Sequence, residues 1–166
     1  MPNYYTAIGL QNPKSPTNVG SVMRAAGCYS VDAVFYTGTR YDRAASFQTD
    51  THQISSRIPL QCVEDMVLAV PEQTRIVCVE LVQGAQPLPS YAHPERALFL
   101  FGPEDGSLDQ SIVDRADDVV YVPTEMCMNL AASVNVLLYD RLAKTGRGAD
   151  RAIEEIRDTN NRLKIS

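Results

Sequence analysis

Short apolar runs alternate along the chain with segments whose apolar residues recur every three or four positions. The apolar runs predict strands at 4–10, 33–37, 58–62, 75–81, 97–101 and 119–122. The segments with helical spacing predict helices at 18–28, 63–70, 109–116, 128–144 and 149–163. Strands that alternate with helices predict an α/β fold with a mostly parallel sheet flanked by helices. Residues 38–57 follow neither period, and we expect a functional loop with a short helix there.

The first predicted helix carries the first candidate block, Asn18-x-Gly20-x-x-x-Arg24. Asn18 has a side chain that can cap the helix. The positions with the spacing of a buried face are Val19, Val22, Met23 and Ala26. Arg24 falls on the opposite side, where Gly20 and Gly27 leave room for the backbone of another chain. Taken alone, the pattern also fits a capped helix with one surface arginine.

The second block, Gly102-Pro103-Glu104-Asp105-Gly106, directly follows the fifth apolar run. Ligands of open α/β sheets bind outside the carboxyl ends of the strands, and glycine lets the backbone approach a ligand closely. The block is therefore a candidate ligand site, although a tight turn would have a similar composition.

The third block, Cys127-Met128-Asn129-Leu130, opens the longest predicted helix. Asn129 can cap this helix, and that alone would explain an asparagine here. The helix has a broad apolar face made of Leu130, Val134, Leu137, Leu138 and Leu142. A nucleophilic Cys127 is a competing interpretation, but no histidine is placed near it in the sequence to activate it.

In this order, the three blocks resemble the signature blocks of the SpoU/TrmH branch of the SPOUT RNA methyltransferases, over about residues 4–144. The resemblance implies a deep trefoil knot in the C-terminal part of the sheet and a homodimer whose active site draws on both subunits. It also implies methyl transfer from S-adenosylmethionine to a ribose 2′-hydroxyl of RNA, an in-line displacement that needs no metal.

The extent of the chain indicates which members of this family it resembles most. The sequence starts directly at its first predicted strand, whereas most relatives with extra N-terminal domains use them to grip RNA. The chain is therefore similar to the minimal members, some of which methylate a wobble ribose of tRNA. We expect a single domain over residues 1–166, with a helical tail at 145–166, and tRNA as the favoured substrate, with rRNA left open.

The resemblance also implies roles for particular residues. The expected catalytic residues are Arg24, Asn18, Glu104 and Asn129. We expect the charged guanidinium of Arg24 to stabilise the developing alkoxide, because an arginine pKa above about 12 makes a neutral base hard to supply. Asn18 and Asn129 would position the substrate, and Glu104 would orient the site. The residues expected against the cofactor are Leu81, Gly102, Val122, Cys127, Met128 and Leu130.

Two departures from the family pattern keep another hypothesis open. Cys127 stands where members usually have serine, and the connection from Pro123 to Asn129 is shorter than in close relatives. Together with an acidic net charge, these departures would also suit a knotted protein that binds RNA or cofactor without catalysis.

The net charge of −5 is unevenly distributed along the chain. Residues 1–60 carry five basic and three acidic residues, 61–140 carry three and thirteen, and 141–166 carry seven and four. The basic ends could therefore supply an RNA-binding face while the acidic middle lies elsewhere. The candidate RNA contacts are Lys14, Arg24, Arg40, Arg43 and Arg57.

Cysteine spacing and hydropathy exclude several other classes of protein. Of the four cysteines, we expect Cys28, Cys62 and Cys78 to be core thiols, and no C-x-x-C spacing indicates a disulfide framework or a zinc site. The apolar runs are too short for a membrane span, and the N-terminus lacks the regions of a signal peptide. We therefore expect a cytoplasmic protein.

Overall fold

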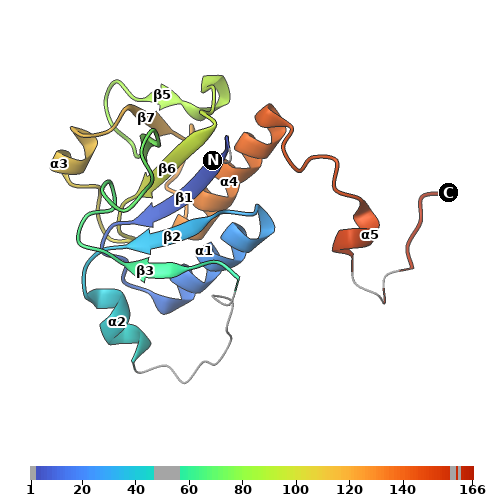
Figure 1. Ribbon diagram of the computed structural model, residues 1–166, viewed down its shortest axis with the longest axis horizontal. Coiled ribbons are helices and arrows are strands. Elements are labelled where there is room, and N and C mark those ends of the chain that lie inside the picture. The colour runs from blue at the N-terminus through green and yellow to red at the C-terminus, as the bar shows by residue number, and fades with distance from the viewer. Residues whose placement is uncertain (1–2, 47–56, 158–159, 161) are drawn as a thin grey trace.

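The computed structural model describes residues 3–46, 57–157, 160 and 162–166. Its centre is a seven-stranded sheet in the order β3-β2-β1-β6-β4-β7-β5, in which each neighbouring pair is parallel (Figure 1). The strands are β1 (Tyr5–Leu10), β2 (Ala33–Tyr36), β3 (Leu60–Cys62), β4 (Arg75–Val79), β5 (Gln86–Pro87), β6 (Arg96–Phe101) and β7 (Asp118–Tyr121). The predicted α/β fold with a parallel sheet and flanking helices is confirmed, and the knot stays a prediction.

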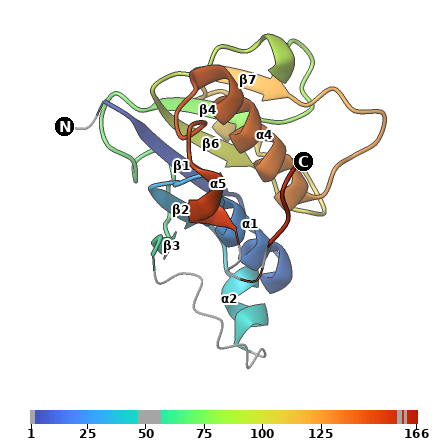
Figure 2. The same cartoon turned by 90° about the vertical axis from the view of Figure 1, so that its right-hand side faces the viewer.

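Helices cover the sheet on both faces. The helical segments are α1 (Pro16–Cys28), α2 (Arg40–Ala45), η2 (Leu88–Ser90), α3 (Gln110–Val113), α4 (Leu130–Thr145) and α5 (Ile153–Ile156). Figure 2 shows α1 and α4 together on one face of the sheet. The other face is covered by α3 and by the segment 63–70, whose apolar side chains pack against it.

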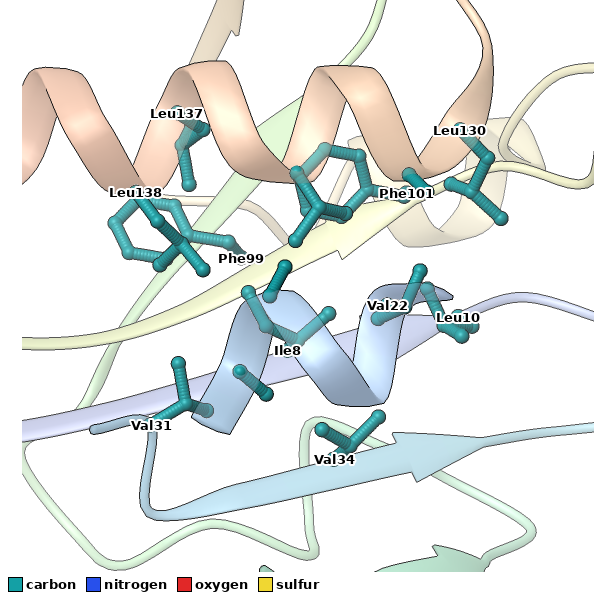
Figure 3. Close-up of a cluster of buried hydrophobic side chains, with 14 of the residues drawn as sticks. Ile8, Leu10, Val22, Val31, Val34, Phe99, Phe101, Leu130, Leu137 and Leu138 are labelled. Carbon is teal, nitrogen blue, oxygen red and sulfur yellow. The ribbon is translucent and has the colours of Figure 1, made fainter. Parts of the chain in front are cut away.

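The larger core lies between the sheet and the pair α1 and α4 (Figure 3). Ile8 of β1 and Phe99 of β6 are fully buried there, as are Val22 of α1 and Leu137 of α4. These are positions with the predicted periodicity, and truncating such a side chain to alanine costs about 2–5 kcal/mol. The core therefore fixes both helices against the two central strands.

The first helix starts differently from the prediction. Ser15, not Asn18, is its N-cap, and the Ser15 hydroxyl accepts a hydrogen bond from the Asn18 backbone N–H at 3.3 Å. Pro16 follows at the first helical position, where its missing N–H costs nothing. The side chain of Asn18 is consequently available for contacts with other elements.

The predicted helix at 63–70 is wrong, because this segment forms turns. Asp65 Oδ1 accepts hydrogen bonds from the backbone N–H groups of Val67 and Leu68, which gives this stretch an alternative to helical hydrogen bonds. Met66 is buried against the sheet all the same, so the apolar residues fill the core without a helix.

The predicted helix at 149–163 is also wrong over most of its described length, since only α5 is helical. Ile153 and Ile156 are exposed, and Figure 1 shows the tail running away from the sheet. Helices this short are unstable in water without tertiary packing. Residues 158–159 and 161 of the predicted helix, and 47–56 of the predicted loop, lie outside the described residues.

The cysteines differ from the prediction as well. Cys78 is buried, but Cys28 and Cys62 are exposed. Cys28 ends α1 and Cys62 lies on the edge strand β3, two places where sequence hydrophobicity overstates burial. Among the described residues, no group of three or more His, Cys, Asp or Glu side chains could hold a metal ion. No described helix has the length and apolar composition needed to cross a membrane.

Candidate active site

A pocket of about 340 Å³ lies at the carboxyl ends of β4, β6 and β7. Because these strands are parallel neighbours, the segments that follow them meet at one edge of the sheet. All six residues predicted to lie against a cofactor line this pocket: Leu81, Gly102, Val122, Cys127, Met128 and Leu130. Its volume is in the range of about 300–1,000 Å³ found for small-molecule sites.

Three of the four predicted catalytic residues also line the pocket and are joined by hydrogen bonds. The Asn18 side-chain amide donates to Glu104 Oε1 at 3.3 Å, and the Asn129 amide donates to Asn18 Oδ1 at 3.4 Å. The three candidate blocks, far apart in the sequence, therefore come together at one wall of the pocket.

Glu104 connects the second block to the start of α1. Its two carboxylate oxygens accept the backbone N–H groups of Lys14 at 2.9 Å and Ser15 at 3.1 Å. Burial raises the pKa of the Glu104 carboxyl, but backbone and side-chain hydrogen bonds outweigh it, so the pKa lies below its ordinary value. Glu104 is thus a charged acceptor that holds the loop before α1.

Asn129 has a double role. Its side-chain oxygen accepts hydrogen bonds from the backbone N–H groups of Ala131 at 2.9 Å and Ala132 at 3.4 Å, which caps α4 as predicted. Its side-chain amide nitrogen donates to Asn18, so the capping residue also connects α4 to α1. The helix-cap interpretation and the site interpretation of Asn129 are therefore both compatible with the structure.

Gly102 occupies a position where a side chain would not fit. A Cβ there would lie 2.8 Å from the Leu108 backbone nitrogen and 3.0 Å from the Ser107 carbonyl carbon, both of which are main-chain atoms. It would also lie 3.2 Å from Glu80 Oε2. Glycine therefore lets the backbone of residues 107–108 pack closely against this position.

Glu80 lines the pocket and was not predicted from the sequence. Its carboxylate accepts the backbone N–H groups of Leu81 at 2.9 Å and Leu108 at 3.0 Å. A signal was present, since Glu80 directly follows β4 and carboxyl ends of parallel strands are where ligands bind.

Arg24 lies on the exposed side of α1, as predicted, but not among the residues that line the pocket. The positions of Gly20 and Gly27 on the same helix are open, because a Cβ at either would have no atom of another element within 4 Å. The exposed face of α1 around Arg24 can therefore be approached closely from outside the chain.

Arg40 is engaged within the protein. Its guanidinium donates two hydrogen bonds to Asp105, at 2.9 and 3.0 Å, and one to the Asn12 carbonyl at 2.6 Å. The pKa of Arg40 is raised chiefly by its hydrogen bond to Asp105, and Arg40 in turn lowers the pKa of the Asp105 carboxyl. This residue ties α2 to the second block, a role that its position in the sequence did not indicate.

The remaining candidate RNA contacts do not form one face. Lys14 and Arg43 are exposed, on the segment after β1 and on the helix after β2. Arg57 is exposed too, but it precedes β3 and therefore lies toward the amino ends of the strands. The structure brings Lys14, Arg40 and Arg43 to the edge of the sheet that carries the pocket, and leaves Arg57 at the other.

Taken together, the parallel sheet and the glycine-lined pocket at its carboxyl edge define an α/β protein with a small-molecule site. The family model of the SpoU rRNA Methylase family matches residues 5–139, which include all three blocks. The chain therefore belongs to the SpoU rRNA methylase family. Among curated protein sequences, none matches it significantly.

Solved structures share this fold at low sequence identity. The A. aeolicus TrmH/SpoU tRNA modifying enzyme is 16% identical with a TM-score of 0.73, over 91% of this chain and 83% of that chain. The SpoU methyltransferase AviRb from Streptomyces viridochromogenes, in complex with AdoMet, is 17% identical with a TM-score of 0.68. That match covers 87% of this chain but only 62% of AviRb.

A third structure, described as "Structural insights into the 2-OH methylation of C/U34 on tRNA", is 18% identical with a TM-score of 0.69. The match covers 86% of this chain and 92% of that one. The two chains are therefore of similar extent.

Proposed function

We propose that this protein transfers a methyl group from S-adenosylmethionine to a ribose 2′-hydroxyl of RNA. The observation that carries the proposal is the meeting of the three family blocks at one pocket, where Asn18, Glu104 and Asn129 are linked by hydrogen bonds. The pocket suits the cofactor because apolar side chains such as Leu81 and Leu130 line it beside polar groups.

The bound cofactor supplies an activated methyl group, and the protein has to align a ribose oxygen with it and help that oxygen to lose its proton. Arg24 is the residue we assign to the developing alkoxide, as a charged hydrogen-bond donor. Since Arg24 lies outside the pocket of its own chain, we propose that it serves the pocket of the partner subunit in a homodimer. Glu104 and the two asparagines hold the loops around the reacting groups.

We favour tRNA as the substrate. One similar structure, of nearly the same extent, is described as concerning the 2-OH methylation of C/U34 on tRNA, and another is a tRNA modifying enzyme. The name of the family refers to rRNA, so rRNA is the alternative substrate. We also propose that the loops around the pocket form the trefoil knot that the family resemblance implies.

The direct test is incubation of the purified protein with S-adenosylmethionine that carries a labelled methyl group and with total tRNA or rRNA. We expect label on a ribose of one nucleotide in tRNA, found by nuclease digestion and mass spectrometry. Label on a base would refute the 2′-O assignment. Tight cofactor binding with no transfer to any RNA would favour the non-catalytic hypothesis, which the cysteine at 127 also motivates.

A further inference from the structure

We propose that Glu80 makes the pocket selective for the positively charged cofactor over its neutral product, an inference that rests on the proposed function. Among the described residues that line the pocket, Glu80 and Glu104 carry carboxylates and none is a lysine, arginine or histidine. The charged side chains that line the pocket are therefore all acidic, which favours a cationic ligand.

The chemistry of the two ligands differs in one charge. S-adenosylmethionine carries a sulfonium, an ammonium and a carboxylate, for a net charge of +1. Methyl transfer breaks the bond from sulfur to the methyl carbon and forms a bond from that carbon to the ribose oxygen, whose proton passes to solvent. It leaves S-adenosylhomocysteine, whose thioether is neutral. Apart from the methyl group, shape and hydrogen-bonding groups are nearly the same, so the charge on sulfur is the main difference that an electrostatic feature of the site can recognise.

Glu80 is better suited to this role than Glu104. The Glu104 carboxylate is occupied by three donors, from Lys14, Ser15 and Asn18. Glu80 accepts two, from the backbone of Leu81 and Leu108, and a carboxylate has about four acceptor positions.

The same two hydrogen bonds fix where the Glu80 charge lies. They hold the carboxylate between the end of β4 and the loop 102–108, where Glu80 Oε2 would lie 3.2 Å from a Cβ on Gly102. Since Gly102 lines the pocket, the charge is held at its wall and does not have to be ordered when a ligand binds.

The consequence is a pocket whose attraction for its ligand weakens as the reaction proceeds. The protein binds the sulfonium form with the help of the Glu80 charge and loses that contribution when the sulfur becomes neutral. This favours release of the product and lessens its inhibition of the next turnover.

Isothermal titration calorimetry of both ligands with the wild-type protein, Glu80→Gln and Glu72→Gln tests the proposal. Glu72 is an exposed glutamate that precedes the same strand, at its other end, so Glu72→Gln removes an equal charge away from the pocket. We expect Glu80→Gln to weaken S-adenosylmethionine binding about tenfold, which is about 1.4 kcal/mol, and to change S-adenosylhomocysteine binding by less than about threefold. Glu72→Gln should change neither.

An equal loss of affinity for both ligands in Glu80→Gln would overturn the proposal, because it would mean that Glu80 only shapes the loop or contacts a group common to both ligands. No change for either ligand would overturn it too. Glu80→Asp, which keeps the charge, should retain the preference for the sulfonium form, and the wild-type preference should decline as salt is raised. If the wild-type protein binds neither ligand, the proposed function itself fails.

Discussion

Arg24 is the residue on which the proposed chemistry depends most directly. Because it is exposed on α1 and lies outside its own chain's pocket, Arg24→Ala should leave the fold and cofactor affinity unchanged. We expect stability to change by no more than about 0.5 kcal/mol, as for other surface substitutions. The single-turnover rate of methyl transfer with saturating RNA should fall by about a hundredfold or more.

Arg24→Lys is the matched control for charge. It keeps a positive charge but loses the planar fork of donors, so we expect cofactor binding like the wild type and a much reduced rate. A rate for Arg24→Ala close to that of the wild type would refute the assignment even if the fold is right.

His93 provides a residue-scale prediction on pH. Its side chain is buried, its Nε2 lies 2.7 Å from Asp140 Oδ2, and burial lowers the pKa of His93 more than the hydrogen bond to Asp140 raises it. The unfolded chain binds a proton near pH 6.5, while folded His93 binds it only at lower pH. Unfolding therefore takes up a proton below about pH 6.5, and the free energy of unfolding should fall there by at most about 1.4 kcal/mol per pH unit.

Urea denaturation between pH 8 and 5 measures this slope. Carboxyls with lowered pKa values, such as those of Asp65 and Glu104, lose their contribution only at still lower pH. We expect His93→Gln to flatten the slope. An unchanged slope in His93→Gln would show that another group titrates.

At the scale of elements, the ion pair between Arg40 and Asp105 joins α2 to the loop that carries Glu104. Arg40→Ala should let this loop move relative to the start of α1 and lower the rate of methyl transfer about tenfold or more, because small misplacements at a reacting centre are costly. The thermal midpoint should change little, since both side chains are partly exposed.

Arg115→Ala is the matched control for that prediction. Arg115 forms a similarly exposed pair with Asp65, at 2.8 and 3.2 Å, on the face of the sheet away from α1 and α4. The Arg115→Ala variant should leave the rate of methyl transfer unchanged. The double variant Arg40→Asp with Asp105→Arg should recover part of the activity that each single variant loses, and failure of any such recovery would argue against the pair as the cause.

At the scale of the whole molecule, α4 presents an apolar surface that the described residues of its own chain leave exposed. Tyr139 is 61% exposed and Val136 38%, and they border a groove with Leu88, Pro89 and Pro123. An aromatic and aliphatic patch of this kind suits a subunit interface, and the family resemblance implies one. We expect a dimer in sedimentation experiments at micromolar concentration.

Replacing Tyr139 by glutamate should shift this dimer toward monomer and abolish transfer, because the partner's Arg24 would be removed from the pocket. Leu68→Glu, at an exposed leucine on the segment that covers the other face, is the control and should leave the dimer intact. A monomeric wild-type protein that methylates RNA would rule out the shared site.

Much of the fold was predictable because its strands and its long helices carry their own periodic patterns. The strands at 5–10 and 96–101 and the helix from Leu130 are close to their predicted limits. The predicted helices at 63–70 and 149–163 were wrong because eight to fifteen residues with helical spacing do not by themselves fix a helix. Asp65 competes for backbone N–H groups in the first segment, and the apolar side chains of Ile153 and Ile156 stay exposed in the second.

The sequence by itself determined most of the alternation of strands and helices and the order of the three blocks, because local pattern carries that information. The family resemblance of the blocks indicated six of the residues that line the pocket. Only the tertiary structure decided which polar groups meet. Asn18, predicted as a cap, donates a hydrogen bond to Glu104, and Arg40, predicted as an RNA contact, pairs with Asp105. Glu80, which was not predicted, lines the pocket. The first two contacts join residues 86 and 65 positions apart, and Glu80 meets the second block because β4 and β6 are neighbours in the sheet. Such contacts depend on the folded backbone and not on any local sequence pattern.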